Sequence, residues 1–214
     1  MSIVAFVNQK GGCAKSTTAV HFSYWLFHKQ RNVLLVDADA QRSSSIWLES
    51  LEVPIPCQVV QSASVLLTEL PKLAEQHDAV IVDGPAGLSD ATKAIVQCAD
   101  LAVIPCQPSG VDLRSAADAI RLIQQAQVIR GGAPMAAVFL SRAVKGTRLK
   151  DEAIGHLASL GVPILKTVIH QRQAVADTFG QAATAWELLG KAAVEAADEF
   201  EQLFREIMAL LPKE

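Results

Sequence analysis

Short runs of apolar, often β-branched residues recur along the chain, and longer stretches with helical spacing separate them. The runs lie at residues 3–7, 33–36, 79–82, 101–104, 135–140 and 164–169, with a weaker one at 58–61. A helix is expected over about 15–29, directly after the first run. Continuous apolar strands that alternate with helices are typical of a parallel sheet buried on both faces. The pattern therefore predicts a doubly wound, mostly parallel α/β fold, with ligands at the carboxyl ends of the strands.

The last part of the chain, about 186–211, has the pattern of an amphipathic helix. Its apolar positions recur at helical spacing and form one stripe: Phe200, Leu203, Phe204, Ile207, Met208 and Leu211. Most of the charged residues outside the stripe are acidic, and they include Glu195, Asp198, Glu199, Glu201 and Glu206. A membrane-surface helix carries Lys and Arg on its polar face, so this stripe is expected to pack on the domain or on a partner subunit. No linker, repeat or low-complexity stretch interrupts the chain, which predicts a single domain over 1–214.

Composition narrows the functional classes. Half of the 214 residues are hydrophobic and the net charge is −3, so bulk charge gives no reason to expect a polyanion binder. The four cysteines form no CxxC pair and no zinc-ligand spacing. The N-terminus lacks the basic start and long apolar run of a signal peptide, and no apolar run approaches the ~18 residues of a membrane span. We expect a cytoplasmic protein with no membrane partner.

A glycine-containing loop follows the first predicted strand and leads into a helix. It consists of Lys10, Gly11, Gly12, Cys13, Ala14, Lys15, Ser16 and Thr17. The ordinary phosphate-loop pattern G-x-x-x-x-G-K-[ST] would need glycine where the chain has Gln9 and Ala14, whereas K-G-G-x-x-K-[ST] fits at every fixed position. Between a strand and a helix, successive backbone N–H groups and the helix N-terminus face an anion. The loop therefore predicts nucleotide binding, with Lys15 at the β- and γ-phosphates and the Ser16 hydroxyl on Mg²⁺.

This loop resembles the deviant Walker A motif of the ParA/MinD family of ATPases, and the small ParF-type ParA proteins in particular. Four further stretches resemble family motifs in the same order along the chain. Residues 33–41 are a strand followed by D-A-D-A-Q, and residues 80–87 resemble a Walker B strand with Asp83. Residues 104–112 resemble a stretch that lies near the dimer interface and the nucleotide in relatives, and residues 169–173 resemble a late segment of ParF-type proteins. The resemblance covers nearly the whole chain. It implies ATP or ADP with Mg²⁺ as ligands, and an ATP-dependent homodimer.

The resemblance also implies roles for single residues. Lys10 matches the signature lysine, which in relatives crosses a sandwich dimer to the partner's phosphates, and Asp39 matches the carboxylate that orients the attacking water. Lys10, Lys15 and Asp39 are therefore the expected catalytic residues. Two carboxylates one residue apart beside a phosphate loop favour a Mg²⁺ and water role over simple helix capping. The expected metal residues are Ser16, Asp37 and Asp83.

The sequence departs from the family pattern at three positions. Ala14 replaces the usual glycine, which costs about 1–2 kcal/mol if the position needs a positive φ, so slow hydrolysis is expected. Ala40 replaces the usual proline and is expected to be tolerated. Ser141 stands where relatives often have an asparagine that contacts the base.

Basic residues are concentrated between 142 and 172, where the sequence has six Lys and Arg but only two acidic residues. The basic residues are Arg142, Lys145, Arg148, Lys150, Lys166 and Arg172. Relatives bind DNA without sequence preference through basic residues of this half of the chain. The resemblance therefore implies a salt-dependent DNA surface formed by these residues, and association with the nucleoid.

Four functions remain open. The first is a positioning ATPase whose slow hydrolysis is stimulated by DNA and by a ParB-like or other adaptor. Its cargo is a plasmid or chromosome, or else a protein assembly such as a carboxysome or chemotaxis cluster. The second is a MinD-like membrane-associated regulator, which the acidic tail disfavours. The third is a metabolic or metallocluster-carrier ATPase, and carriers usually present a paired-cysteine motif that this chain lacks. The fourth is a nucleotide-binding scaffold with negligible turnover.

Overall fold

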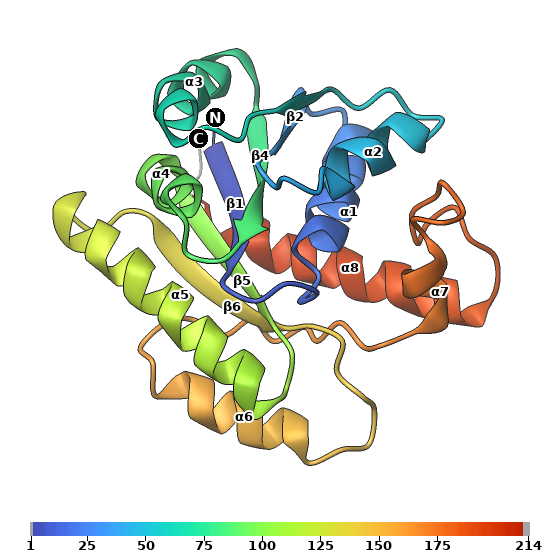
Figure 1. Cartoon of the computed structure of the whole chain (residues 1–214). Coiled ribbons are helices and arrows are strands. Elements are labelled where there is room, and N and C mark those ends of the chain that lie inside the picture. The colour runs from blue at the N-terminus through green and yellow to red at the C-terminus, as the bar shows by residue number, and fades with distance from the viewer. Residues whose placement is uncertain (1, 212–214) are drawn as a thin grey trace.

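The computed structural model describes residues 2–211, in which six strands form one parallel sheet with the order β3-β2-β4-β1-β5-β6 (Figure 1). The strands are β1 (Ser2–Asn8), β2 (Val33–Asp37), β3 (Cys57–Val59), β4 (Ala79–Ala86), β5 (Leu101–Cys106) and β6 (Met135–Leu140). The helices are α1 (Lys15–His28), α2 (Ser43–Ser50), α3 (Ala63–Gln76), α4 (Asp90–Cys98), α5 (Gly110–Ile129), α6 (Leu149–Ala158), α7 (Gln173–Asp177) and α8 (Lys191–Leu210).

Helices cover both faces of the sheet, as the continuous apolar strands predict. In β1, Ile3, Ala5 and Val7 pack with α3, α4 and α5, whereas Val4 and Phe6 pack with α1, α2 and α8. Successive strand residues point to opposite faces, so a strand between two helical layers must be apolar at every position. The doubly wound parallel fold is confirmed. It brings the loops after β1, β2, β4 and β5 to one edge of the sheet.

The predicted seventh strand at 164–169 is wrong. This segment runs beside β6 but forms only an isolated bridge there, between Val138 and Ile164. The backbone N–H groups of Lys166 and Thr167 instead donate to the carboxylate of Glu206 on α8, at 2.6 and 2.9 Å. Because these donors are committed to a side chain, they are not available for a ladder with β6.

The last helix begins at Lys191, not near 186, because Gly190 with φ 101° breaks the chain direction before it. Its apolar stripe packs on the domain, as expected: Phe200, Leu203, Phe204 and Ile207 are buried in the same cluster as Phe22 of α1. This face is therefore not available to a membrane surface. Among residues 2–211, no helix combines the length and apolar character needed to span a membrane.

His21 connects α1 to the segment before α8. Its Nδ1 lies 2.7 Å from the Thr17 carbonyl oxygen, and its Nε2 accepts from the Ala185 N–H at 3.1 Å. The ring stacks on Phe200 with centroids 4.3 Å apart. This arrangement requires the neutral imidazole with the proton on Nδ1. Burial lowers the pKa of His21 to about 4, partly opposed by the Thr17 carbonyl.

We expect acid to remove the contribution of His21 to stability. Below pH 6.5 the unfolded chain binds a proton at His21 that the folded chain excludes, so stability falls as the pH drops from 6.5 to about 4, by about 3 kcal/mol in total. Urea unfolding of wild type and His21→Gln at pH 7.5 and pH 5 measures this, because the difference between the two proteins removes the effect of other titrating groups. The exposed His156→Gln is the matched control. Parallel pH dependence in wild type and His21→Gln would contradict the assignment.

Candidate functional site

The loop between β1 and α1 encloses a space at the N-terminus of α1. Gly12 and Ala14 have φ of 74° and 78°, and this turns the intervening backbone around the start of the helix. The Lys15 side chain is buried and bends back, with its Nζ donating to the Lys10 carbonyl at 3.1 Å. Consecutive N–H groups in such a turn, together with the start of a helix, form an anion-binding concavity.

Ala14 adopts the left-handed backbone conformation, in which a residue with a methyl side chain has a higher free energy than glycine. Its φ of 78° and ψ of 26° place a strain of about 1–2 kcal/mol at this position relative to glycine. Thr18 holds the strained residue, because both its backbone N–H and its hydroxyl donate to the Ala14 carbonyl, at 3.0 and 2.7 Å.

Side chains from two neighbouring strand ends hold the carbonyl groups of the loop. Gln107, after β5, and Arg142, after β6, donate to the Gly12 carbonyl at 2.8 and 3.0 Å. The buried Ser141 hydroxyl donates to the Cys13 carbonyl at 2.9 Å. The Ser141 side chain therefore holds the loop, and its hydroxyl is already committed to this contact. Gln107 lies in the stretch 104–112 that resembles a family motif near the nucleotide, but this side chain was assigned no role of its own from the sequence.

Lys10 makes an ion pair within its own chain. Its Nζ lies 2.7 Å from the carboxylate of Asp112, in the first turn of α5, where Ser109 caps the helix. Asp112 is buried, and its other carboxylate oxygen has no partner among the described residues. Asp112 was assigned no role from the sequence, although the Ser-x-x-Asp spacing signals a helix cap. A role of Lys10 at a partner's phosphates requires that this ion pair break.

The two aspartates after β2 have different environments. Asp37 is fully buried, and its oxygens accept from the N–H groups of Asp39, at 3.0 Å, and Ser45, at 2.8 Å. Asp37 thus ties the β2–α2 loop to α2, a capping arrangement complete without a metal ion, and its metal role stays a prediction. Asp39 is half-buried and lines a cavity that runs along α1.

Asp83 pairs in register with Asp37 on the neighbouring strand and is fully buried. Neither of its carboxylate oxygens has a hydrogen-bond partner among residues 2–211. Burial raises the pKa of Asp83 to about 7; Asp37 adds to the shift, whereas Ser16, Ser44 and Lys15 oppose it. A buried, unpartnered carboxylate beside a hydroxyl suits a divalent cation, which would supply the missing positive charge. Residues 2–211 contain no cluster of three His, Cys, Asp or Glu side chains that would hold a metal unaided.

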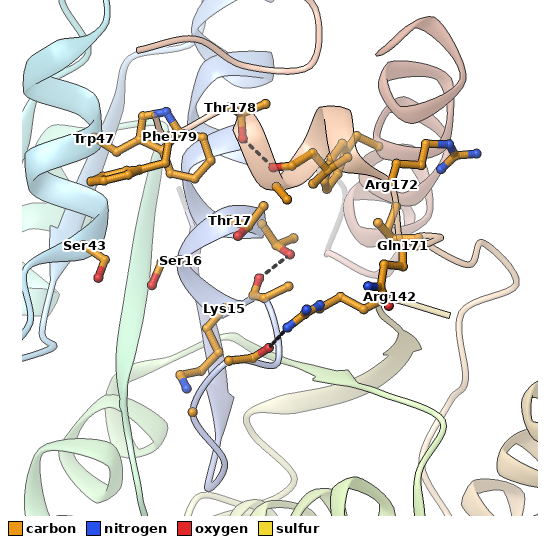
Figure 2. A pocket seen from close by; sticks show the side chains of 18 of the residues that line it. Lys15, Ser16, Thr17, Ser43, Trp47, Arg142, Gln171, Arg172, Thr178 and Phe179 are labelled. Atoms are coloured by element: carbon orange, nitrogen blue, oxygen red, sulfur yellow. Dashed lines mark hydrogen bonds between the residues drawn. The ribbon is translucent and has the colours of Figure 1, made fainter. Parts of the chain in front are cut away.

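One cavity of about 1120 Å³ runs from the loop along α1 (Figure 2). At one end it is lined by six of the predicted nucleotide-binding residues, Gly11, Gly12, Ala14, Lys15, Ser16 and Thr17, together with Asp39, Gln41 and Ser43. Lys10 and Cys13 do not line it; Cys13 is buried, and burial raises the pKa of its thiol. The other end is formed by residues 169–173 and by aromatic side chains that include Trp47 and Phe179. Such a cavity suits a ligand with an anionic end and an apolar, planar end.

The structure does not bring the six predicted DNA-binding residues into one free patch. Arg142 lines the cavity, and Arg172 and Lys145 pair with Glu195 on α8. Lys150 lies 3.8 Å from Asp151. Arg148 and Lys166 are exposed and form no ion pair within the described chain. The acidic face of α8 therefore neutralises part of the local positive charge.

Residues 4–184 match the family described as the CobQ/CobB/MinD/ParA nucleotide binding domain. The chain belongs to this family. It is 32% identical over 213 residues to the maintenance of carboxysome distribution protein A of Gloeobacter kilaueensis, covering 96% of this chain and 93% of that one. It is also 32% identical over 189 residues to protein ParA of Rhizobium radiobacter, covering 84% and 82%. An ATP complex of an aspartate-to-alanine variant of Cyanothece McdA superposes with a TM-score of 0.81 at 18% identity, covering 100% and 98%. The predicted ParA/MinD resemblance is confirmed.

Asp83→Asn should stabilise the nucleotide-free protein. At pH 8 the native carboxylate is charged, buried and unpartnered, so the amide removes a penalty of the order of 1–4 kcal/mol. Below about pH 4 the carboxyl group is protonated in both states and the gain should vanish. Thermal unfolding without Mg²⁺ at the two pH values measures this, with the exposed Asp90→Asn on α4 as control. Destabilisation by Asp83→Asn at pH 8 would show that the carboxylate has a partner.

Proposed function

We propose that this protein is a ParA/MinD-type ATPase that binds MgATP in the cavity at the N-terminus of α1, dimerises around it and hydrolyses it slowly. The observation that carries the proposal is Asp83 of β4, a buried carboxylate without a hydrogen-bond partner among the described residues that lies beside Ser16. The neighbouring loop between β1 and α1 has its carbonyl groups held by donors of its own chain. Of the loop N–H groups, that of Lys10 donates to the Asn8 side chain at 3.2 Å, and we assign the phosphate oxygens to the N–H groups that follow it. The ATP complex of the McdA fold neighbour supports the choice of nucleotide.

The residues take the following roles. Lys15 would neutralise the β- and γ-phosphates. Ser16 and Asp83 would hold Mg²⁺, which would supply positive charge to the phosphate oxygens. Asp39 orients the attacking water, because its carboxylate faces the cavity beside the loop. Lys10 leaves Asp112 and contacts the phosphates of the partner subunit. Since that exchange breaks an ion pair and Ala14 is strained, we infer slow turnover that an adaptor protein and DNA stimulate.

The cellular task we propose is positioning of a cargo. Relatives at 32% identity include both a carboxysome distribution protein and a ParA protein, so they support a protein assembly as cargo as well as they support a plasmid or chromosome. The adaptor that links the ATPase to its cargo would be ParB-like in the second case. In both cases the ATP-bound dimer would hold the nucleoid by non-specific DNA contacts.

The sandwich dimer can be tested with three variants of the site. Asp39→Ala should accumulate a dimer with MgATP, because water is no longer oriented, whereas Lys15→Ala should stay monomeric because it no longer binds nucleotide. Lys10→Ala should bind MgATP yet dimerise poorly. Light-scattering mass in ADP and in ATP measures these states, with the exposed Lys72→Ala on α3 as control. A monomeric Asp39→Ala protein saturated with MgATP would contradict the sandwich dimer.

DNA binding can be tested at the two exposed basic residues. Arg148 and Lys166 are the predicted DNA-binding residues without an ion pair in the described chain, so the double variant Arg148→Ala/Lys166→Ala should weaken binding of the ATP state to random DNA. The log–log salt dependence should become shallower by about one unit for each phosphate that the variant no longer neutralises. Lys72→Ala/Lys93→Ala, on α3 and α4, is a control with the same charge change. Equal binding with ADP and ATP, or an unchanged salt slope, would contradict the proposal.

A further inference from the structure

One wall of the cavity contains an extended segment, residues 169–172, that is held by backbone hydrogen bonds and leads into α7. The Ala143 N–H donates to the Ile169 carbonyl at 3.2 Å, and the Gln171 N–H donates to the Ala143 carbonyl at 2.9 Å. These bonds form a parallel bridge between Ala143 and His170. Because side chains alternate along an extended chain, His170 and Arg172 share one side and Gln171 takes the other.

Glu199 of α8 holds His170 and Arg172, the two residues that share one side of the extended segment. Its carboxylate accepts from the His170 N–H at 3.0 Å, lies 2.8 Å from the His170 Nδ1, and pairs with both terminal nitrogens of Arg172. Glu195 adds a further contact to Arg172 at 3.3 Å. In Figure 2, the Arg172 guanidinium is turned away from the phosphate loop, whereas the Arg142 side chain is directed toward it. The clamp on His170 and Arg172 thereby determines the orientation of Gln171.

The polar side chains around this end of the cavity are committed, with one exception. Arg142 donates to Gly12, Gln173 donates to Asp177, and the Thr178 hydroxyl donates to Val175. His170 and Arg172 are held by Glu199. The Gln171 side-chain amide lines the cavity, is exposed, and makes no hydrogen bond to any residue from 2 to 211. It is the uncommitted polar side chain of this segment of the cavity wall.

A free glutamine amide offers one donor and one acceptor side by side. Adenine presents the complementary pair at its N6 amino group and N7, whereas guanine presents two acceptors, O6 and N7, at the same edge. An arginine would suit the guanine edge, but Arg142 is held by the loop.

We propose that Gln171 is the residue that selects adenine over guanine, and that Glu199 is the positioning residue that aims it. This inference rests on the proposed function, because it assumes a nucleotide with its phosphates at Lys15. Ser141, at the position where relatives often have a base-contacting asparagine, is buried and donates to the Cys13 carbonyl, so base recognition is assigned to Gln171 instead.

The test compares the affinities of the full-length protein for MgATP and MgGTP by calorimetry. Gln171→Ala should lower the ratio of ATP affinity to GTP affinity by about ten- to a hundred-fold, the range expected for one bidentate amide–base pair. Gln181→Ala is the matched control, because this exposed glutamine lies after α7 and does not line the cavity. It should leave the ratio unchanged.

Glu199→Gln tests the positioning role. The amide cannot hold Arg172 as a carboxylate does, so the ATP-to-GTP ratio should fall while the affinity for inorganic tripolyphosphate stays at the wild-type value. If Glu199 had a purely structural role, the variant would bind MgATP, MgGTP and tripolyphosphate all more weakly. Glu199→Asp, which keeps the charge, should restore part of the ratio.

The outcomes separate the two proposals. If wild type binds MgATP and tripolyphosphate but Gln171→Ala keeps the wild-type ratio, this inference is wrong and the proposed ATPase function stands. Equal affinity of wild type for ATP and GTP has the same consequence. If wild type binds no nucleotide and no tripolyphosphate, the proposed function fails, and this inference fails with it.

Discussion

The conformation of the phosphate loop depends on donors that hydrogen-bond to its carbonyl groups. These donors fix the backbone in the turn that directs its N–H groups toward a ligand. Lys15 holds the carbonyl of Lys10, Gln107 and Arg142 hold that of Gly12, Ser141 holds that of Cys13, and Thr18 holds that of Ala14. These donors come from α1 and from the ends of β5 and β6. The loop is therefore tied by hydrogen bonds to the sheet edge that surrounds it, and these bonds hold Ala14 in its strained conformation.

The carboxylates of the site differ in how far their charge is compensated by neighbouring groups. Lys10 and Asp112 neutralise each other within the chain, and Asp37 has backbone donors, whereas the carboxylate oxygens of Asp83 have no hydrogen-bond partner among the described residues, and Lys15 offsets only part of the cost of burying its charge. A fully buried carboxylate is costly in this condition, so the folded protein gains from whatever cation completes the site. We infer that ligand binding and stability are coupled through Asp83, and that dimerisation competes with the ion pair of Lys10.

Helix α8 shapes the far end of the cavity although it is distant from the phosphate loop in sequence. Its apolar face completes the core against α1, and its acidic face binds backbone and basic groups of residues 166–172. Glu206 takes the donors that would have made a seventh strand, and Glu199 orients the wall beside the proposed base site. An acidic helix whose sequence is typical of a solvated face thus acts as an internal scaffold.

The sequence alone determined the parallel α/β fold, because apolar runs without polar alternation can be satisfied only between two helical layers. It also located the glycine-containing turn between β1 and α1 and the place of Asp83 in β4, since these depend on local order along the chain: strand, glycine turn and helix, or strand and terminal carboxylate. It could not decide which charges meet. Lys10 and Asp112 are 102 positions apart, and Arg172 and Glu199 are 27 apart, so packing alone brings them together. For the same reason, six basic residues that look like one patch in sequence are divided by the tertiary structure between the cavity, the acidic helix and the open surface.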